Sequence, residues 1–407
     1  MNKSGRLIRA ITWRQLNLAL VIAGYDQVIP GNEREIKGLN GSGLHNFESG
    51  GNIMSEEEVE ATGWDAIEEQ MSGLYGQQEP KHYAALLPYI LGGKDPLNGI
   101  SAYQAEQPYP HWHFVTFGFS ELYEKESEDP EYSGYGFELT FRLARTDGEE
   151  EPPAWAMNLL QNMARYVFSS GNIFASGHYL DANGPICLGA DTRLTALAFT
   201  GDPELPAIDT PNGRVEFLQM VGITADELEA MMSWNTNAFL QASQGVLPAY
   251  ITDLGRDSLL RLPAIEDAVR QGIERDGSQT GILYVDQLDF EPGRNRLLSK
   301  APAVLAMGAQ QAATVAMLLR GRLLKGRKLT LTSPKLQVVL EPAQETGCGE
   351  DGGTVRIGLS EEAVLELESK LKPKESEFKL STAKELMIRV RKTYIKDQEG
   401  NVVDTIG

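Results

Sequence analysis

Cysteine and histidine are scarce in this sequence, which contains 2 Cys and 5 His among its 407 residues. Cys187 and Cys348 lie in different halves of the chain and form no spacing typical of a metal site, so reduced thiols are expected. No run of about 18 apolar residues occurs, and the sequence therefore predicts no membrane span. Together these features favour a cytoplasmic protein.

Basic residues are also few, because 37 Lys and Arg stand against 57 Asp and Glu, for a formal net charge of -20. Such an acidic surface repels phosphate backbones, so direct nucleic-acid binding is not expected. The acid excess is compatible with solubility alone or with a basic partner. With 407 residues and 42% hydrophobic content, the chain can bury a sizeable core, and its length favours two domains.

Motifs that carry catalysis are absent too. The sequence contains no Gly-x-Ser-x-Gly, His-Glu-x-x-His or Cys-x-x-Cys, so neither catalytic residues nor a cofactor are predicted. Residues 321–326 have the spacing of a phosphate-binding loop, but Arg and Lys follow where Lys and Ser or Thr are required. We interpret the region as a basic patch on a strand face, either solvated or in contact with carboxylates of this chain or a partner. The patch comprises Arg320, Arg322, Lys325, Arg327 and Lys328.

The strongest metal candidate is the pair His111 and His113. They occupy positions i and i+2 of a predicted strand and so point to the same side of a sheet. No cysteine or second histidine pair nearby completes a metal site. Two packed, hydrogen-bonded imidazoles are therefore the favoured interpretation, and a metal-dependent enzyme is an alternative.

The clearest structural pattern lies in residues 110–141. Alternation over residues 111–117 and 135–141, with an acidic run between them, predicts two strands joined by a solvated loop. Helices and strands alternate irregularly elsewhere, which predicts an α+β fold of mostly antiparallel or mixed sheets with packed helices. The other expected elements are helices at 64–76, between Pro153 and Gly171, and at 224–232, 262–273 and 360–371; strands at 172–178, 195–199, 215–221, 314–319, 322–324, 328–331, 336–340, 355–359 and 386–390; and a flexible turn at 345–353.

Composition divides the chain into three parts. Residues 1–53 are mildly basic and rich in Gly, Asn and Ser, and we expect a disordered or misassigned leader. Met54 precedes Ser55 and three glutamates, a capping-box pattern that would begin a helix and makes Met54 a candidate initiator. Two α+β domains are expected at 54–278 and 279–407.

Several long motifs resemble one family. They are His-Trp-His-Phe at 111–114 with Ser-Glu-Leu-Tyr at 120–123, Ser-Gly-Tyr-Gly-Phe-Glu-Leu-Thr-Phe-Arg at 133–142, Leu-Gly-Gly-Lys-Asp-Pro-Leu at 91–97 and Asn-Gly-Arg-Val-Glu-Phe-Leu at 212–218. Taken in chain order, these motifs resemble suppressor of fused, in a compact form without the long insertion of the animal proteins. That compact form is similar to the bacterial branch of the family.

The resemblance implies two α+β domains that close on an extended peptide, added as a strand between them without any catalysis. A partner protein or peptide is thus expected, and an immunity protein that neutralises a toxin is a narrower alternative. His178 stands where the animal proteins have an aspartate, so the same ligand is not expected. The partner-binding residues that the resemblance implies are Tyr166, Phe174 and His178 in the first domain and Arg320, Arg322 and Leu324, on a strand, in the second.

Overall fold

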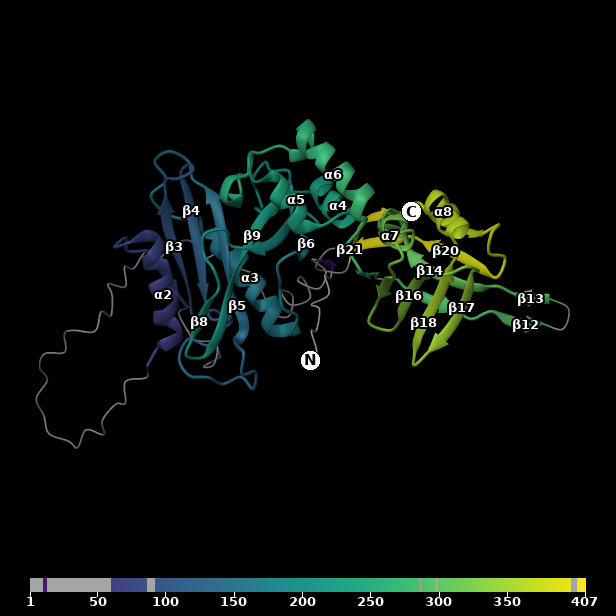
Figure 1. The fold of residues 1–407 in the computed structure, drawn as a ribbon, viewed down its shortest axis with the longest axis horizontal. Coiled ribbons are helices and arrows are strands. Elements are labelled where there is room, and N and C mark those ends of the chain that lie inside the picture. Colours follow the sequence, from purple (N-terminus) through teal and green to yellow (C-terminus); the bar gives the residue numbers. More distant parts are fainter. Residues whose placement is uncertain (1–9, 13–59, 86–91, 286, 297–298, 397–400) are drawn as a thin grey trace, which may run out of the picture.

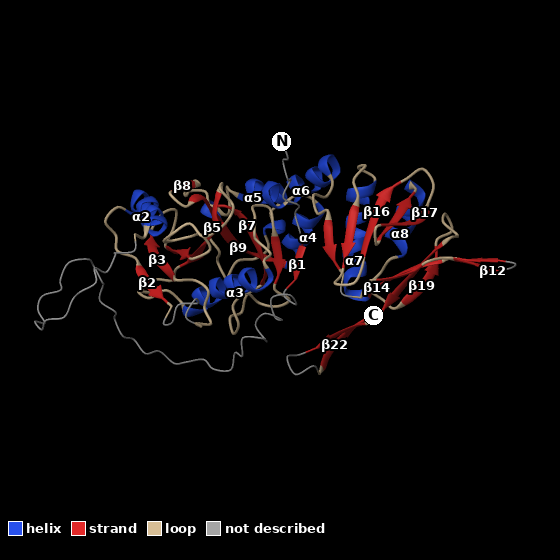
Figure 2. Ribbon diagram, turned by 90° about the horizontal axis from the view of Figure 1, so that it is seen from below, coloured by secondary structure: helices blue, strands red, loops and turns tan. Residues whose placement is uncertain are grey.

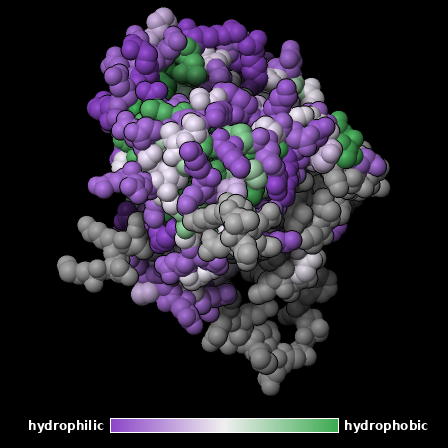
Figure 3. Space-filling model, turned by 90° about the vertical axis from the view of Figure 1, so that its right-hand side faces the viewer, coloured by the Kyte–Doolittle hydropathy of each residue, from purple (hydrophilic) through white to green (hydrophobic). Residues whose placement is uncertain are grey.

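The computed structural model describes residues 10–12, 60–85, 92–285, 287–296, 299–396 and 401–407. Its fold is α+β, as predicted. Figure 1 shows a large sheet with its helices at one end of the molecule and two smaller sheets at the other. Figure 3 shows that the surface at the second end is largely hydrophilic, with hydrophobic residues in small separate patches.

A nine-stranded mixed sheet forms the first half, and the predicted pair of strands lies within it. β4 (His111–Phe117) and β5 (Tyr132–Ala144) are antiparallel neighbours, with Phe114 opposite Phe141. The strand order is β1-β6-β7-β9-β5-β4-β3-β2, with β8 paired to β9. The remaining strands are β1 (Ala10–Thr12), β2 (Lys81–Ala84), β3 (Gly99–Ala105), β6 (Tyr179–Asp181), β7 (Leu194–Gly201), β8 (Ile208–Thr210) and β9 (Gly213–Thr224).

Alternating side chains give this sheet two apolar faces. Trp112 and Phe114 of β4 join the core that includes α3 (Ala154–Ser170), whereas Val115 and Phe117 join the core under α2 (Thr62–Tyr75). The predicted capping box at Thr224 and the left-handed Gly171 at the end of α3 are both present. The other helical elements of this half are α4 (Ala225–Ser233), α5 (Thr236–Ser243), α6 (Pro263–Asp276) and the 3-10 turns η2 (Pro248–Tyr250) and η3 (Leu259–Arg261).

Two separate sheets form the second half. The five-stranded sheet has the order β10-β15-β16-β18-β17, and the four-stranded sheet has the order β11-β14-β20-β19. Two further hairpins pair β12 with β13 and β21 with β22. The bounds are β10 (Ile282–Tyr284), β11 (Asp289–Glu291), β12 (Arg294–Arg296), β13 (Ser299–Ala301), β14 (Ala303–Gly308), α7 (Ala309–Leu323), β15 (Leu329–Thr332), β16 (Gln337–Pro342), β17 (Gly347–Asp351), β18 (Thr354–Leu359), α8 (Glu361–Lys370), β19 (Ser376–Lys379), β20 (Leu386–Arg391), β21 (Thr393–Lys396) and β22 (Val402–Ile406).

The structure corrects several sequence predictions. Residues 314–319, 322 and 323, predicted within strands, belong to helix α7, because Val315, Leu318, Leu319 and Leu323 recur at helical spacing and are buried, and Leu324 is the C-cap residue of that helix. The predicted strand at 172–178 is a loop, and the predicted turn at 345–353 contains strand β17.

Within the predicted leader, Ala10–Thr12 forms strand β1 rather than disordered chain. The capping box at Ser55 lies outside the described residues.

One apolar core connects the two halves. Trp234 and Val269, which follow the nine-stranded sheet, share a cluster with Leu283 of β10 and Leu319 of α7. Burying such a continuous apolar surface holds the end of the large sheet against the smaller ones. The short segment between α6 and β10 crosses this region, so its hydrogen bonds fix where β10 begins.

Candidate functional site

Strand β6 pairs with β7 on its inner side, and some of its backbone groups point to the opposite, outer side. On the inner side, the N–H of Phe199 donates to the carbonyl of His178 and the N–H of Ala182 donates to the carbonyl of Thr195, both at 2.9 Å. Because backbone groups alternate along a strand, those of Tyr179 and Asp181 point to the outer side. Strand β1 lies there in parallel orientation, with Ile11 opposite Leu180.

Strand β10 presents a second edge. The N–H of Thr330 donates to the carbonyl of Gly281, and the N–H of Val285 donates to the carbonyl of Thr332. By the same alternation, Ile282 and Tyr284 direct their N–H and carbonyl groups away from β15. This is the outer side of the five-stranded sheet.

Strand β1 lies between these two edges. Its Cα atoms come within 8 Å of those of β10, although only β6 forms a ladder with it among the described strands. Figure 2 shows β1 at the boundary between the two halves. We call the outer edge of β6, the outer edge of β10 and the space that β1 occupies the strand site.

The segment that leads into β10 is fixed to the first half. The Ser278 hydroxyl donates to the carbonyl of Met232 at 2.6 Å, and the N–H of Gln279 donates to the carbonyl of Trp234 at 2.8 Å. The Thr280 hydroxyl lies 3.0 Å from the hydroxyl of Tyr179, a residue of β6. The two edges of the strand site are therefore held at a set position relative to each other.

Two arginines, from the end of α7 and from the turn after it, donate hydrogen bonds to the same segment. Arg322 donates to the carbonyls of Ser278 at 3.0 Å and Lys328 at 2.7 Å, and Arg327 also donates to the carbonyl of Ser278, at 3.0 Å. Burial and the charge of Arg327 lower the pKa of Arg322 to about 10, so it remains charged at neutral pH. Neither alternative for the basic patch, solvation or contact with carboxylates, holds for Arg322, because the residue is buried and the partners of its guanidinium here are main-chain carbonyls.

The residues implied as partner-binding divide between two places. Tyr166 and Phe174 are buried with ring centroids 5.6 Å apart, and Phe174 stacks on Phe199 of β7 at 4.2 Å. His178, next to the start of β6, accepts a hydrogen bond from the N–H of Ala175 through its Nδ1. These three thus lie behind or beside the β6 edge.

The other three lie at the end of α7, and not on the strand that the resemblance implied. Arg320 is exposed, Arg322 is buried at the segment before β10, and Leu324 is partly buried. Sequence reasoning missed Tyr179, Asp181, Ile282 and Tyr284, since β6 and β10 are too short to give a periodic signal.

His113 belongs to a buried polar cluster elsewhere in the first half. Its Nδ1 lies 2.8 Å from the Tyr75 hydroxyl and its Nε2 lies 3.3 Å from Oδ2 of Asp202. Arg142 donates to both oxygens of that carboxylate, at 2.7 and 3.0 Å. Burial and the charge of Arg142 lower the pKa of His113 to about 4, so the imidazole is neutral at pH 7. Burial alone would raise the pKa of Asp202, but its bonds to His113 and Arg142 lower it.

His111 has a separate partner. Its Nδ1 donates to the carbonyl of Tyr109 at 2.8 Å. The favoured interpretation of two buried, hydrogen-bonded imidazoles is thus confirmed. Within the described ranges, no three His, Cys, Asp or Glu side chains are grouped to hold a metal ion. The alternative of a metal-dependent enzyme built on His111 and His113 gains no support from this arrangement.

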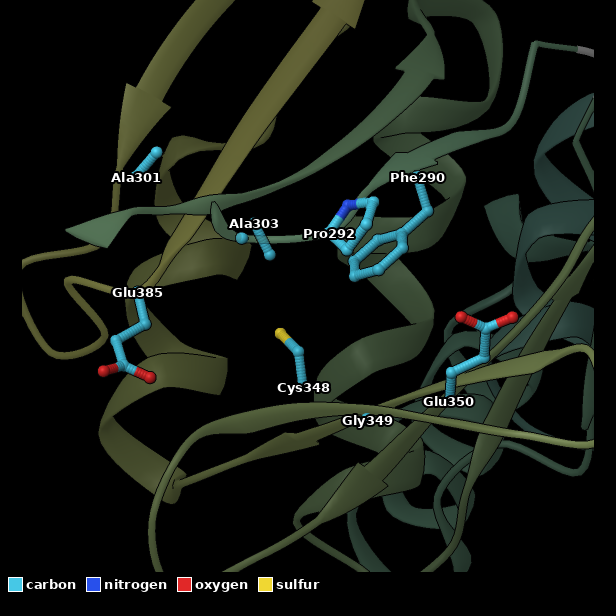
Figure 4. A pocket seen from close by; sticks show the side chains of 9 residues that line it. Phe290, Pro292, Ala301, Ala303, Cys348, Gly349, Glu350 and Glu385 are labelled. Carbon is cyan, nitrogen blue, oxygen red and sulfur yellow. The ribbon is translucent and has the colours of Figure 1, made fainter. Parts of the chain in front are cut away.

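A small pocket lies in the second half. It has a volume of about 280 Å³ between the β11–β14 sheet and β17, and Figure 4 shows the Cys348 thiol directed into it. β17 lies at the opposite edge of the five-stranded sheet from β10, so the pocket is not part of the strand site. Across the part of the chain that the structure describes, no helix is both long and apolar enough to cross a membrane.

Comparisons with known proteins agree with this architecture. The family model described as suppressor of fused protein matches residues 93–257. Curated suppressor of fused homologs from Homo sapiens and Mus musculus are each 38% identical over 236 residues, which cover 53% of this chain and 48% of each relative. The chain therefore spans about half the length of the curated relatives it matches.

A solved structure extends the similarity beyond that region. The crystal structure of Drosophila suppressor of fused has a TM-score of 0.68 and 24% sequence identity, and the match covers 81% of this chain and 97% of that one. This likeness shows that the fold is shared through both halves. This chain therefore contains a suppressor of fused region at residues 93–257, and in sequence and fold it is similar to suppressor of fused proteins.

Proposed function

We propose that this chain is a non-enzymatic binding protein that holds an extended segment of a partner protein as a strand in the strand site. The observation that carries the proposal is the pair of facing edges. Tyr179 and Asp181 on one side, and Ile282 and Tyr284 on the other, direct backbone groups toward a space that already contains a strand. Binding of this kind requires no catalytic residue.

The free energy of such binding would come mainly from the backbone. Each main-chain hydrogen bond adds about 1 kcal/mol net, so a strand with ladders on both sides gains several kcal/mol before any side chain contributes. A preformed site also lowers the cost of ordering on the receptor side. The hydrogen bonds of Ser278, Gln279 and Thr280 supply that preorganisation, because they fix β10 relative to β6.

The resemblance noted in the sequence supports the same proposal, since it implies strand addition between two domains. On that basis we also propose that this chain comprises two domains, residues 54–278 and residues 279–407. We also propose the cytoplasm as the place where the protein acts, in keeping with its acidic composition and scarce cysteine. No specific observation among the described residues supports the toxin-neutralising role or a metal-dependent activity.

The proposal can be tested without knowing the partner. A display library of random 12-residue peptides is selected against the full chain, and bound peptides are mapped by amide hydrogen exchange. We expect protection of amides in β6 (Tyr179–Asp181) and β10 (Ile282–Tyr284). Failure to select any peptide, or protection confined to the pocket beside β17, would contradict the proposal.

A further inference from the structure

The strand site contains a segment of the chain itself. β1 (Ala10–Thr12) runs parallel to β6, with Ala10 opposite Tyr179 and Thr12 opposite Asp181. It occupies the position that the proposed function assigns to a partner. We infer that residues 10–12 are an intramolecular occupant that closes the site, and that a partner strand binds by displacing them. This inference rests on the proposed function.

Backbone geometry shows how β1 is held. Tyr179 and Asp181 direct their backbone groups outward, so the β1 residue between them in register, Ile11, directs its N–H and carbonyl to β6. Ala10 and Thr12 then direct theirs toward the β10 side, where the described strands form no ladder with β1. One side of the occupant is therefore bonded to β6, and the other side faces β10, whose Cα atoms come within 8 Å of those of β1.

Such an occupant binds weakly enough to be displaced. Ordering one residue costs about 1–2 kcal/mol of backbone entropy, whereas one main-chain hydrogen bond returns about 1 kcal/mol net. A three-residue strand whose one ladder consists of the N–H and carbonyl of Ile11 is thus held only weakly by its backbone. A longer partner segment that forms ladders with both β6 and β10 gains more bonds per ordered residue and can replace it.

Covalent attachment adds a local concentration on the order of millimolar, which keeps a weak occupant in place. The apparent dissociation constant of a partner rises by the inverse of the fraction of chains in which the site is open.

The occupant also indicates the chemistry of the partner. Its own sequence is Arg-Ala-Ile-Thr at residues 9–12, a short β-branched stretch next to arginine. A partner segment that competes for the same edges should therefore be extended, rich in β-branched residues and flanked by basic side chains.

The test uses the full chain and a fluorescein-labelled peptide of residues 6–16 as the probe. Ile11→Pro removes the one N–H of β1 that faces β6 and disfavours the ladder, while Ile11→Ala keeps that N–H and is the matched control. We expect the probe to bind the Ile11→Pro chain at least about tenfold more tightly than the native chain or the control, by fluorescence anisotropy.

Two results would overturn the inference. Equal binding of the probe to all three chains would mean that β1 does not close the site, although the proposed function would stand. Binding to none of them would mean that this segment is not a ligand of the site. The proposed function fails separately, if selection against the native chain gives no peptide or gives only peptides that protect neither β6 nor β10.

A second measurement examines the pairing directly. Thr12→Cys with Asp181→Cys, in a Cys187→Ser, Cys348→Ser background, places two thiols at paired strand positions. Oxidation should give a cross-linked monomer, seen as a mobility shift on a non-reducing gel that reducing agent reverses. A cross-linked dimer would assign the occupant to a second copy, and no cross-link would remove β1 from the site; either result overturns the inference.

Discussion

Replacing Arg322 by lysine should loosen the connection between the two halves. The guanidinium reaches two carbonyls at once, those of Ser278 and Lys328, from a side chain that is 8% exposed. A lysine ammonium is a single point donor and cannot reproduce this forked geometry. Arg327 still donates to Ser278, so the carbonyl of Lys328 is the group that loses its charged donor.

The magnitude follows from that count. A hydrogen bond to a charged group contributes about 1.5–3 kcal/mol, and one such partner is lost. We therefore expect Arg322→Lys to lower the free energy of unfolding by about 2 kcal/mol. Arg320→Lys is the matched control, because Arg320 is exposed on the same helix and its replacement should change stability by less than about 0.5 kcal/mol.

Urea unfolding followed by tryptophan fluorescence measures the difference, and Trp234 lies beside the segment concerned. Amide exchange gives a local reading, since the N–H of Gln279, bonded to the carbonyl of Trp234, should exchange faster in Arg322→Lys than in Arg320→Lys. Equal stability and equal Gln279 exchange in the two variants would refute the assignment of Arg322 to this connection.

Three further predictions concern the cores. Gly272→Ala would place a methyl group against the Trp234 indole, too close for both to fit, and should cost about 3 kcal/mol of stability. Gly73→Ala meets nothing within 4 Å and should stabilise its helix by about 0.5 kcal/mol, and equal Tm values for the two variants would contradict this. Asp202→Asn removes the carboxylate that pairs with a buried guanidinium, so a loss of about 3 kcal/mol is expected in urea unfolding, and a loss below about 1 kcal/mol would argue against that pairing. Folding lowers the pKa of His113 from 6.5 to about 4, so between pH 4 and 6.5 the unfolded chain binds more protons than the folded chain. The free energy of unfolding should therefore fall by about 3 kcal/mol as the pH drops from 6.5 to 4. If His113→Gln had the same pH dependence of stability as the native chain, this prediction would be contradicted.

Elements with a strong local signal could be predicted from the sequence. The strands at 111–117 and 135–141 alternate over at least seven residues, and the helices that follow Thr224 and Ser360 have these residues as clear N-caps. Helix α7 was misread because the apolar run at 314–319 is compatible with either a strand or a helix, and its helical spacing appears only when residues up to 323 are included.

The strand site could not be predicted from local patterns. β1, β6 and β10 are three-residue strands that lie far apart in the sequence, and their edges are defined only by the packing of one half against the other. The resemblance indicated strand addition between two domains, but it placed the second-domain contacts on residues 320–327, which form the end of α7 and the turn after it. Tertiary structure alone identifies β10 as the second edge.

The most direct test of strand addition compares two changes at one edge residue. Asp181→Pro removes an N–H that faces the incoming strand and leaves the bonds to β7 intact, whereas Asp181→Ala keeps that N–H. The account predicts that a library-selected peptide loses at least about tenfold in affinity with proline and little with alanine, as measured by calorimetry. Unchanged affinity in Asp181→Pro, with the fold confirmed by circular dichroism, would contradict binding at the β6 edge.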